Sequence, residues 1–332
     1  MPDIIDVKNL ILVYSNGTKA VDNITFSVEE GDFFGFLGPN GAGKSTTIKV
    51  LTTLLKKTSG TVKVAGFDLD KESKEIRKVI GVQSQETALD GDLTGKENLM
   101  LQGHFQQLSG KVLDDRVNEL LKLVNLEKFA DKRVRNYSGG MRKRLDLATT
   151  LVHKPKLVFL DEPTTGLDPQ SRSAIWDYLE KLNKEEKTTV FLTTQYMEEA
   201  DRLCKKLAII DTGKIVATGT PKDLKQQLGV DSIKITLKNC AKDKKAAIDL
   251  LKSLTGVTNI SESGDCVTAF AKNAHELIAD IVRALDSLEI SLAGISFSSP
   301  TLDDVYLRKT GKRIRPEELV KSSGGRFGGR RR

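Results

Sequence analysis

The first third of the chain alternates apolar stretches with turn-forming residues, a pattern that predicts β-strands. We expect strands in DVKNLILVY, AVDNITFSVEEG, DFFGFLG and TVKVAGFDL. Beyond Gln85 the apolar positions change to helical spacing, and Val117, Leu120, Leu121 and Val124 predict an amphipathic helix. Two later runs, PKLVFLDEP and TTVFLTTQ, lack polar alternation, which suits parallel strands covered on both faces. The pattern as a whole predicts an α/β fold.

The hydrophobic pattern changes again near Gly229. From there the predicted elements follow the order β-α-β-β-α-β, which is typical of a ferredoxin-like unit. We therefore expect a small α+β domain over residues 229–311, after a larger domain over residues 1–228 that ends with a hairpin around Thr212–Gly213. One face of the small sheet would be open, and we expect the larger domain or a second copy to cover it.

The formal net charge is +7, but most of it belongs to the C-terminal tail. Residues 312–332 contain eight basic and two acidic residues, a net +6. Their sequence has little to bury, so we expect a disordered basic tail. Such a tail would either be attracted to an anionic membrane surface or only keep the chain soluble. The remainder is nearly neutral, so its charge does not indicate a nucleic-acid partner.

No apolar run reaches the roughly 18–20 residues of a membrane helix, and the N-terminal MPDIIDVKNL does not have the form of a signal peptide. We expect a soluble, globular protein. Three cysteines lack metal-ligand spacing and are interpreted as ordinary thiols in a reducing cytosol: Cys204, Cys240 and Cys266. Three histidines lie in separate helical stretches and are interpreted as structural: His104, His153 and His275.

The stretch GPNGAGKS, from Gly38 to Ser45, fits the phosphate-binding pattern G-x-x-x-x-G-K-[ST] between an apolar strand and a helix. Its glycines allow backbone N–H groups to surround a phosphate, and the helix N-terminus favours negative charge. Lys44 would contact the terminal phosphates, and the Ser45 hydroxyl would bind Mg²⁺. The motif predicts a nucleotide-phosphate site formed by Gly38, Pro39, Asn40, Gly41, Ala42, Gly43, Lys44, Ser45 and Thr46.

Two carboxylates end the apolar strand KLVFLDEP. We expect Asp161 to hold the metal, directly or through water, and Glu162 to act as the general base for the attacking water. Adjacent acidic residues at a strand end are also common in solvated loops. The phosphate-binding loop upstream favours the catalytic interpretation.

A second anion-binding helix end is predicted in YSGGMRKRLDLA, where Ser138, Gly139 and Gly140 offer a hydroxyl and exposed backbone amides. One nucleotide needs only one phosphate-binding loop, so a second calls for an explanation. The basic run that follows, Arg142 to Arg144, is interpreted as a solvated helix face.

Four motifs taken together resemble the ATP-binding-cassette ATPases: GPNGAGKST, YSGGM with LDLA, VFLDEPTTGLDP and TTQYMEEAD, in this order. The resemblance covers residues 4 to about 228. It implies a P-loop NTPase cassette with a RecA-like core, an antiparallel β subdomain and a helical subdomain over about residues 86–155. It also implies a dimer, in which two cassettes enclose two ATP molecules and the serine-glycine-glycine segment of each completes the site of the other.

The resemblance also implies roles for single residues. Tyr14 would stack on adenine, Gln85 would sense Mg²⁺ and contact the membrane partner, and Asp168 would bridge the two cassettes. Many family members have histidine where this chain has Gln195. We expect Gln195 to donate an amide hydrogen bond near the γ-phosphate, the alternative being an ordinary loop glutamine.

The serine-glycine-glycine segment is the family's signature, and many members have glutamine after it where this chain has Met141. Met141 and Gln195 are both similar to the residues found in one branch of the family, the daunorubicin-resistance-type drug exporters. That branch also ends in a small domain that closes with a segment like SPTLDDVYLRKTG. The likeness implies an ATPase subunit, peripheral on the cytoplasmic face of the cell membrane. It would energise export of a drug-like or lipid-like substrate through a separate permease, which would contact residues 86–137.

Two other functions are compatible with a nucleotide-binding chain of this kind. A soluble cassette ATPase acting on nucleic acid or ribosomes is the first, but the chain has one phosphate-binding loop and no room for a coiled coil between Gln85 and Ser138. A regulatory ATP-binding module that does not hydrolyse ATP is the second, and the presence of Glu162 disfavours it.

Overall fold

The computed structural model describes residues 2–85, 87–228, 231–238, 240–263, 266–271 and 274–311. The chain divides into two compact units, and the second extends from Ala217 to Arg313. It begins before residue 229 because α8 (Pro221–Gln226) packs on α11 (Leu302–Thr310) and buries Leu224 and Tyr306. The basic tail predicted over residues 312–332 lies outside the described residues.

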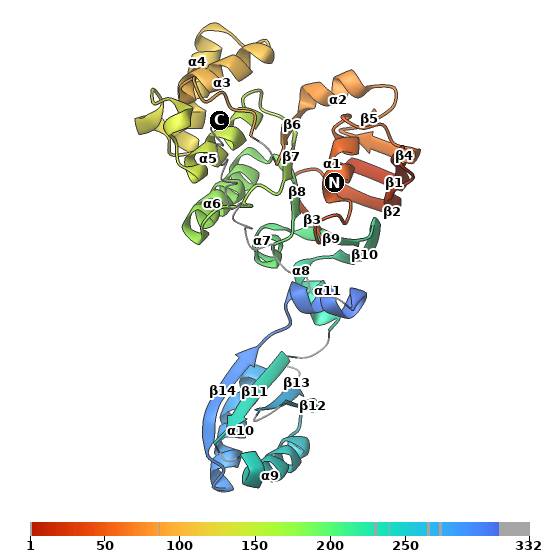
Figure 1. Cartoon of the computed structure of the whole chain (residues 1–332), viewed down its shortest axis with the longest axis vertical. Coiled ribbons are helices and arrows are strands. Elements are labelled where there is room, and N and C mark those ends of the chain that lie inside the picture. The colour runs from red at the N-terminus through yellow and green to blue at the C-terminus, as the bar shows by residue number, and fades with distance from the viewer. Residues whose placement is uncertain are drawn as a thin grey trace, which may run out of the picture. The chain divides into compact units, whose positions relative to one another are not determined.

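A six-stranded sheet forms the centre of the first unit, with the order β10-β9-β3-β8-β7-β6 (Figure 1). The strands from β9 to β6 in this order are parallel to their neighbours. Every residue of β3, β7 and β8 is buried, which explains their unbroken apolar runs. The strands are β3 (Phe33–Leu37), β6 (Ile80–Gln83), β7 (Leu157–Asp161), β8 (Thr189–Thr194), β9 (Lys206–Asp211) and β10 (Lys214–Gly219).

A second, antiparallel sheet has the order β2-β1-β4-β5 and contains the other strands predicted in the first third of the chain. Its strands are β1 (Asp3–Val13), β2 (Lys19–Glu29), β4 (Ser59–Val64) and β5 (Phe67–Asp68). The two sheets share one core, in which the Phe26 ring contacts Phe34, Phe36 and Phe191 at 5.5–6.0 Å between ring centroids. Four helices accompany these sheets: α1 (Lys44–Leu51), α2 (Ser73–Val79), α6 (Pro169–Glu186) and α7 (Met197–Leu203).

A helical segment is inserted between β6 and β7. It contains α3 (Gly95–Phe105), α4 (Gly110–Leu123), α5 (Gly139–Thr150) and two single 3₁₀ turns, Glu127–Phe129 and Val134–Asn136. The apolar face predicted from Val117 to Val124 is buried, as expected. The prediction that Arg142 to Arg144 form a solvated helix face was wrong for Lys143 and Arg144, which bond to backbone carbonyls. Lys143 donates to the Gln85 carbonyl at 3.0 Å and Arg144 to the Val124 carbonyl at 2.9 Å.

The second unit contains the predicted β-α-β-β-α-β order, with the strands arranged β12-β13-β11-β14. Both helices contribute to one core on the same sheet face. The sheet face opposite the helices carries mainly hydroxyl side chains, such as Ser232, Thr268 and Ser296. Because hydroxyl groups can stay in contact with water, this face does not need another domain to cover it. The elements are β11 (Asp231–Leu237), α9 (Cys240–Ser253), β12 (Val257–Ser263), β13 (Cys266–Ala271), α10 (Ala274–Ser287) and β14 (Leu292–Ser298). Within the described residues, none of the helices combines the length and apolar character needed to cross a bilayer.

Candidate functional site

The predicted phosphate-binding segment, Gly38 to Ser45, lies between β3 and α1, where the motif requires it. Gly41 and Gly43 have φ angles of 77° and 105°, which residues with side chains rarely adopt. Because α1 begins at Lys44, its first backbone N–H groups have no acceptor within the helix. The segment therefore has the backbone geometry of an anion site.

Lys44 and Glu162 are paired in this site. The Lys44 ammonium lies 3.0 Å from Glu162 Oε1, and the two side chains are only 3% and 7% exposed. The ammonium also donates to the carbonyl oxygens of Gly38 and Pro39, at 2.8 and 3.0 Å. The predicted phosphate-binding lysine and the predicted general base are thus in direct contact.

Asp161 accepts two hydrogen bonds on one oxygen. Ser45 Oγ donates to Asp161 Oδ1 at 3.0 Å, and Thr193 Oγ1 donates to the same atom at 2.6 Å. Adjacent ligands of an octahedral Mg²⁺ ion, each at about 2.1 Å, lie about 3 Å apart. The oxygens of Ser45 and Asp161 therefore fit the role of two ligands to one Mg²⁺.

Glu162 has a backbone conformation that is rare for a residue with a side chain. Its φ angle is 50°, and its N–H is held by the carbonyl and hydroxyl oxygens of Thr193 at 3.1 and 3.2 Å. Thr165 Oγ1 donates to Glu162 Oε2 at 3.3 Å. Such conformations persist where neighbouring bonds fix them, and they are frequent in functional sites.

A cavity of about 720 Å³ connects most of the predicted ATP-site residues. Its lining also includes Tyr14, whose Oη lies 3.1 Å from Thr46 Oγ1, and Gln85. The loop residues Gly38, Pro39 and Ala42 do not line it, and neither does Asp161, which lies behind Ser45. The lining residues are Tyr14, Thr18, Lys19, Ala20, Asn40, Gly41, Gly43, Lys44, Ser45, Thr46, Gln85, Glu162, Thr212 and Gly213.

The second predicted anion site does not belong to this cavity. Ser138 caps α5 by accepting from the Met141 N–H at 3.2 Å, and a side chain on Gly139 would enter open space. Ser138, Gly139 and Gly140 are all absent from the cavity lining. One chain therefore has two separate helix ends suited to phosphate.

Asp168 is exposed and caps α6. It accepts from the Ser171 N–H at 2.9 Å and from Ser171 Oγ at 2.6 Å, and these bonds hold the pKa of Asp168 below its ordinary value. A Cβ atom on the signature residue Gly140 would lie 2.8 Å from Ser171 Oγ. Asp168 and the signature end of α5 are thus neighbours, although the sequence separates them widely.

Gln195 directly follows β8 and is 6% exposed. It does not line the cavity, but the residue before it is bonded to the phosphate-binding loop: the Thr194 carbonyl accepts from the Gly38 N–H at 3.2 Å. Gln195 is thus held near the loop without contacting the lined space.

A buried carboxylate on α7, Glu199, was not predicted from the sequence. Glu199 Oε1 accepts from Thr164 Oγ1 at 2.8 Å and from Trp176 Nε1 at 2.9 Å, and burial raises the pKa of this carboxyl. Arg172 stacks on the ring of Tyr196 at 4.1 Å. The segment around Gln195 is therefore fixed to α6. The only signal in the sequence was an acidic residue on an apolar helix face.

The described histidine and cysteine side chains form no metal-binding group. His153 contacts the Ile80 carbonyl at 3.0 Å, and burial lowers its pKa. Among the described residues, no group of three or more histidine, cysteine or acidic side chains could hold a metal ion.

Comparison with known proteins agrees with this geometry. A family model described as "ABC transporter" matches residues 21–165. A daunorubicin resistance ATP-binding protein of Streptomyces coeruleorubidus is 42% identical over 91% of this chain and 94% of its own length. A linearmycin resistance ATP-binding protein of Bacillus subtilis is 36% identical over 94% of this chain and 99% of its own length.

Two solved structures are similar in fold to a large part of this chain. A dimeric ATP-binding cassette in a post-hydrolysis state with ADP and phosphate has a TM-score of 0.60 and 29% identity, over 65% of this chain and 98% of its own. A Clostridium perfringens protein, part of an ABC transporter complex, has a TM-score of 0.64 and 27% identity, over 76% of this chain and 96% of its own. By these similarities, this chain belongs to the ATP-binding-cassette transporter family and is one of its ATPases.

Proposed function

We propose that this chain hydrolyses ATP between two head-to-tail copies of itself and thereby energises export of a drug-like or lipid-like molecule through a separate membrane permease. The dimer is proposed because the two predicted anion sites of one chain are separate. The loop before α1 lines the cavity, whereas the helix end at Ser138 does not and is available to the nucleotide of a second copy. The names of the relatives, which refer to daunorubicin and linearmycin resistance, support drug export. None of the reported relatives is named for nucleic acid or ribosomes, so that alternative is without support.

The chemistry follows from the residues of the cavity. Ser45, Asp161 and Gln85 would hold Mg²⁺, which would neutralise phosphate charge. The γ-phosphate of ATP competes with Glu162 for the Lys44 ammonium, because both partners are anionic. Glu162 is then free to accept a proton from the attacking water, and Gln195 can donate an amide hydrogen bond.

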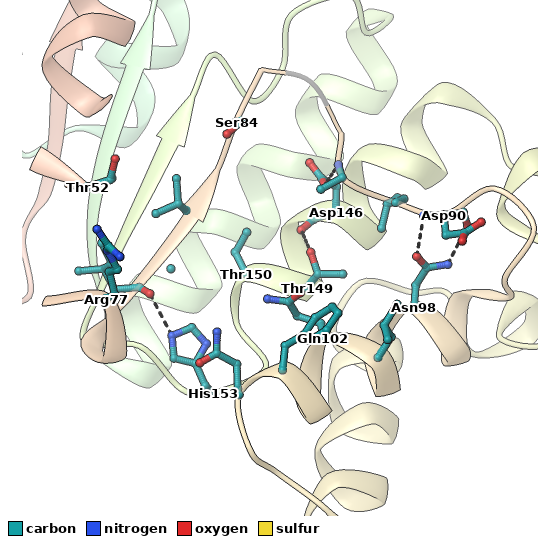
Figure 2. A pocket seen from close by; sticks show the side chains of 18 of the residues that line it. Thr52, Arg77, Ser84, Asp90, Asn98, Gln102, Asp146, Thr149, Thr150 and His153 are labelled. Atoms are coloured by element: carbon teal, nitrogen blue, oxygen red, sulfur yellow. Dashed lines mark hydrogen bonds between the residues drawn. The ribbon is translucent and has the colours of Figure 1, made fainter. Parts of the chain in front are cut away.

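A cleft of about 400 Å³ is the proposed contact for the permease. Figure 2 shows Thr52 and Arg77 on one side, Asp90 and Asn98 on the other, and Asp146 between them. Three exposed apolar side chains also line it: Leu54, Leu101 and Phe105. Exposed apolar side chains gathered at a cleft are typical of a protein contact. A short amphipathic helix of the permease, with apolar residues toward these three, suits this surface.

Part of this cleft belongs to residues 86–137, the segment predicted to contact the permease. The rest of its lining was not predicted: Leu54 and Arg77 come from the sheet-bearing part, and Asp146 comes from α5. We place the chain at the inner face of the cell membrane, bound through the permease. The membrane attraction of the basic tail stays a prediction, because residues 312–332 lie outside the described residues.

Mixing two inactive variants tests the composite site. Lys44→Ala removes the phosphate contact, and Gly139→Glu places a carboxylate in open space at the signature end, where it repels the partner's phosphate. Each variant alone should be inactive. A mixed dimer contains one intact site, so an equal mixture should recover about a quarter of wild-type ATPase activity. An inactive mixture, with mixed dimers confirmed by differential tagging, would contradict the head-to-tail site.

Phe105→Ser tests the permease contact. Phe105 is 71% exposed, so its loss should leave the fold and the ATPase activity of the isolated chain unchanged. Losing one buried aromatic contact of about 2 kcal/mol should weaken binding to the permease by about 10- to 100-fold. Val112→Ser is the matched control, because Val112 is 68% exposed and does not line this cleft. Equal export and equal permease binding for both variants would exclude Phe105 from the contact.

A further inference from the structure

The segment that contains Gln85 is bonded on both sides to α5. Gln83, at the end of β6, donates from Nε2 to Asp146 Oδ2 at 3.0 Å, and the Ala88 N–H is directed at Asp146 Oδ1 at 3.4 Å. Between them, the Gln85 carbonyl accepts from Lys143 Nζ at 3.0 Å. Two side chains of one helix therefore contact three points of the described part of this segment.

We propose that Lys143 and Asp146, together the loop anchor, are positioning residues that hold Gln85 at the metal site and connect it to the signature helix. The loop anchor lies on α5, the helix that begins behind Ser138. Asp146 also lines the cleft proposed for the permease. A displacement at the cleft would then move Gln85 of one ATP site together with the signature end that completes the other. This inference rests on the proposed role of Gln85 as a metal ligand.

A carboxylate is required at position 146 because both of its oxygens face donors. Asp146 is 4% exposed, and each oxygen accepts one N–H, from Gln83 and from Ala88. An asparagine would satisfy one donor and turn its own N–H₂ toward the other. Burial raises the pKa of Asp146, while the bond from Gln83 and the charge of Lys143 oppose that shift.

Gln83 provides the means of a sharp test. It is 2% exposed, and its Oε1 atom has no partner among the described residues, so its amide is held through Nε2 and Asp146. The donor and the acceptor of the hydrogen bond between Gln83 and Asp146 can therefore be exchanged by changing both residues. In the double variant Asp146→Asn with Gln83→Glu, the asparagine N–H₂ donates to the new carboxylate, and its oxygen still accepts from Ala88.

The experiment measures hydrogen exchange of the Ala88 amide in the nucleotide-free, metal-free full chain. Asp146→Asn should speed this exchange by about tenfold, the effect of losing one hydrogen bond to a charged acceptor. Gln83→Glu alone should speed it as much or more, because two carboxylates then face each other. The double variant should return to within threefold of wild type. Asp114→Asn, an exposed acid on α4, is the matched control and should change nothing.

The second readout is the Mg²⁺ concentration that gives half-maximal ATPase activity. The same pattern is expected: about a tenfold increase in each single variant, recovery in the double variant, and an increase in Lys143→Met, which removes the bond to the Gln85 carbonyl. ATP binding in the absence of Mg²⁺ should be unchanged throughout. Gln85→Ala sets the size of the effect expected when the ligand itself is lost.

The outcomes separate the two proposals. The loop anchor would be overturned if the double variant exchanged the Ala88 amide faster than either single variant. It would also be overturned if Gln85→Ala raised the Mg²⁺ concentration for half-maximal activity and Asp146→Asn did not. A wild-type chain that hydrolyses no ATP would overturn the proposed function, and the exchange of the Ala88 amide would still decide whether Asp146 holds this segment.

Discussion

Glu162→Gln should nearly abolish ATP hydrolysis while leaving ATP binding intact. Glutamine keeps the volume of the side chain but cannot accept the proton of the attacking water, and loss of a general base lowers turnover by about 100- to 10,000-fold. The dimer should then accumulate around unhydrolysed ATP. Single-turnover release of phosphate measures the first effect, and size-exclusion chromatography with ATP measures the second.

The structure makes this substitution a clean test. Glu162 is buried and its backbone is fixed by Thr193, so an isosteric amide should not disturb the loop. The ion pair with Lys44 becomes a hydrogen bond from the ammonium to a neutral amide oxygen, which should leave Lys44 available to phosphate. Glu198→Gln is the control, since this neighbouring acid is exposed on α7 and should retain wild-type turnover. Turnover within threefold of wild type for Glu162→Gln would remove Glu162 from the role of general base.

The ATP site could be predicted from sequence because its parts are local. The loop from Gly38 to Ser45 needs one strand, one turn and one helix, and all three are adjacent in the chain. The same holds for the strand that ends in Asp161 and Glu162. The order of elements in the second unit was also confirmed, because each strand and helix has its own hydrophobic period.

The partners of buried polar groups could not be predicted in the same way. Lys143 looked like part of a solvated basic run, and its bond to the Gln85 carbonyl joins residues 58 positions apart. Glu199 and Asp146 each lie among apolar residues on one face of a helix, and hydrophobic periodicity does not say which donors a carboxylate meets after folding. The start of the second unit depends similarly on the packing of α8 against α11, two helices at opposite ends of that unit.

Gln195→Ala should lower turnover by about 10- to 100-fold, the effect of losing one transition-state hydrogen-bond donor or slightly less. The structure favours a local effect, because both neighbours of Gln195 are held independently of its side chain. The Thr194 carbonyl accepts from the Gly38 N–H, and the Tyr196 ring stacks on Arg172. The affinity for ATP should therefore change little, and the loss should be in the catalytic rate.

Gln195→His should retain activity, because a histidine at this position also offers an N–H donor. It should add a protonation step to the pH–rate profile near the ordinary histidine pKa of about 6.5, a step that the wild-type glutamine cannot produce. Gln226→Ala, at an exposed position on α8, is the control for loss of an amide that does not line the cavity. Steady-state turnover across pH measures all three variants. Full activity of Gln195→Ala would mean that Gln195 is an ordinary loop residue and that Glu162 alone acts on the attacking water.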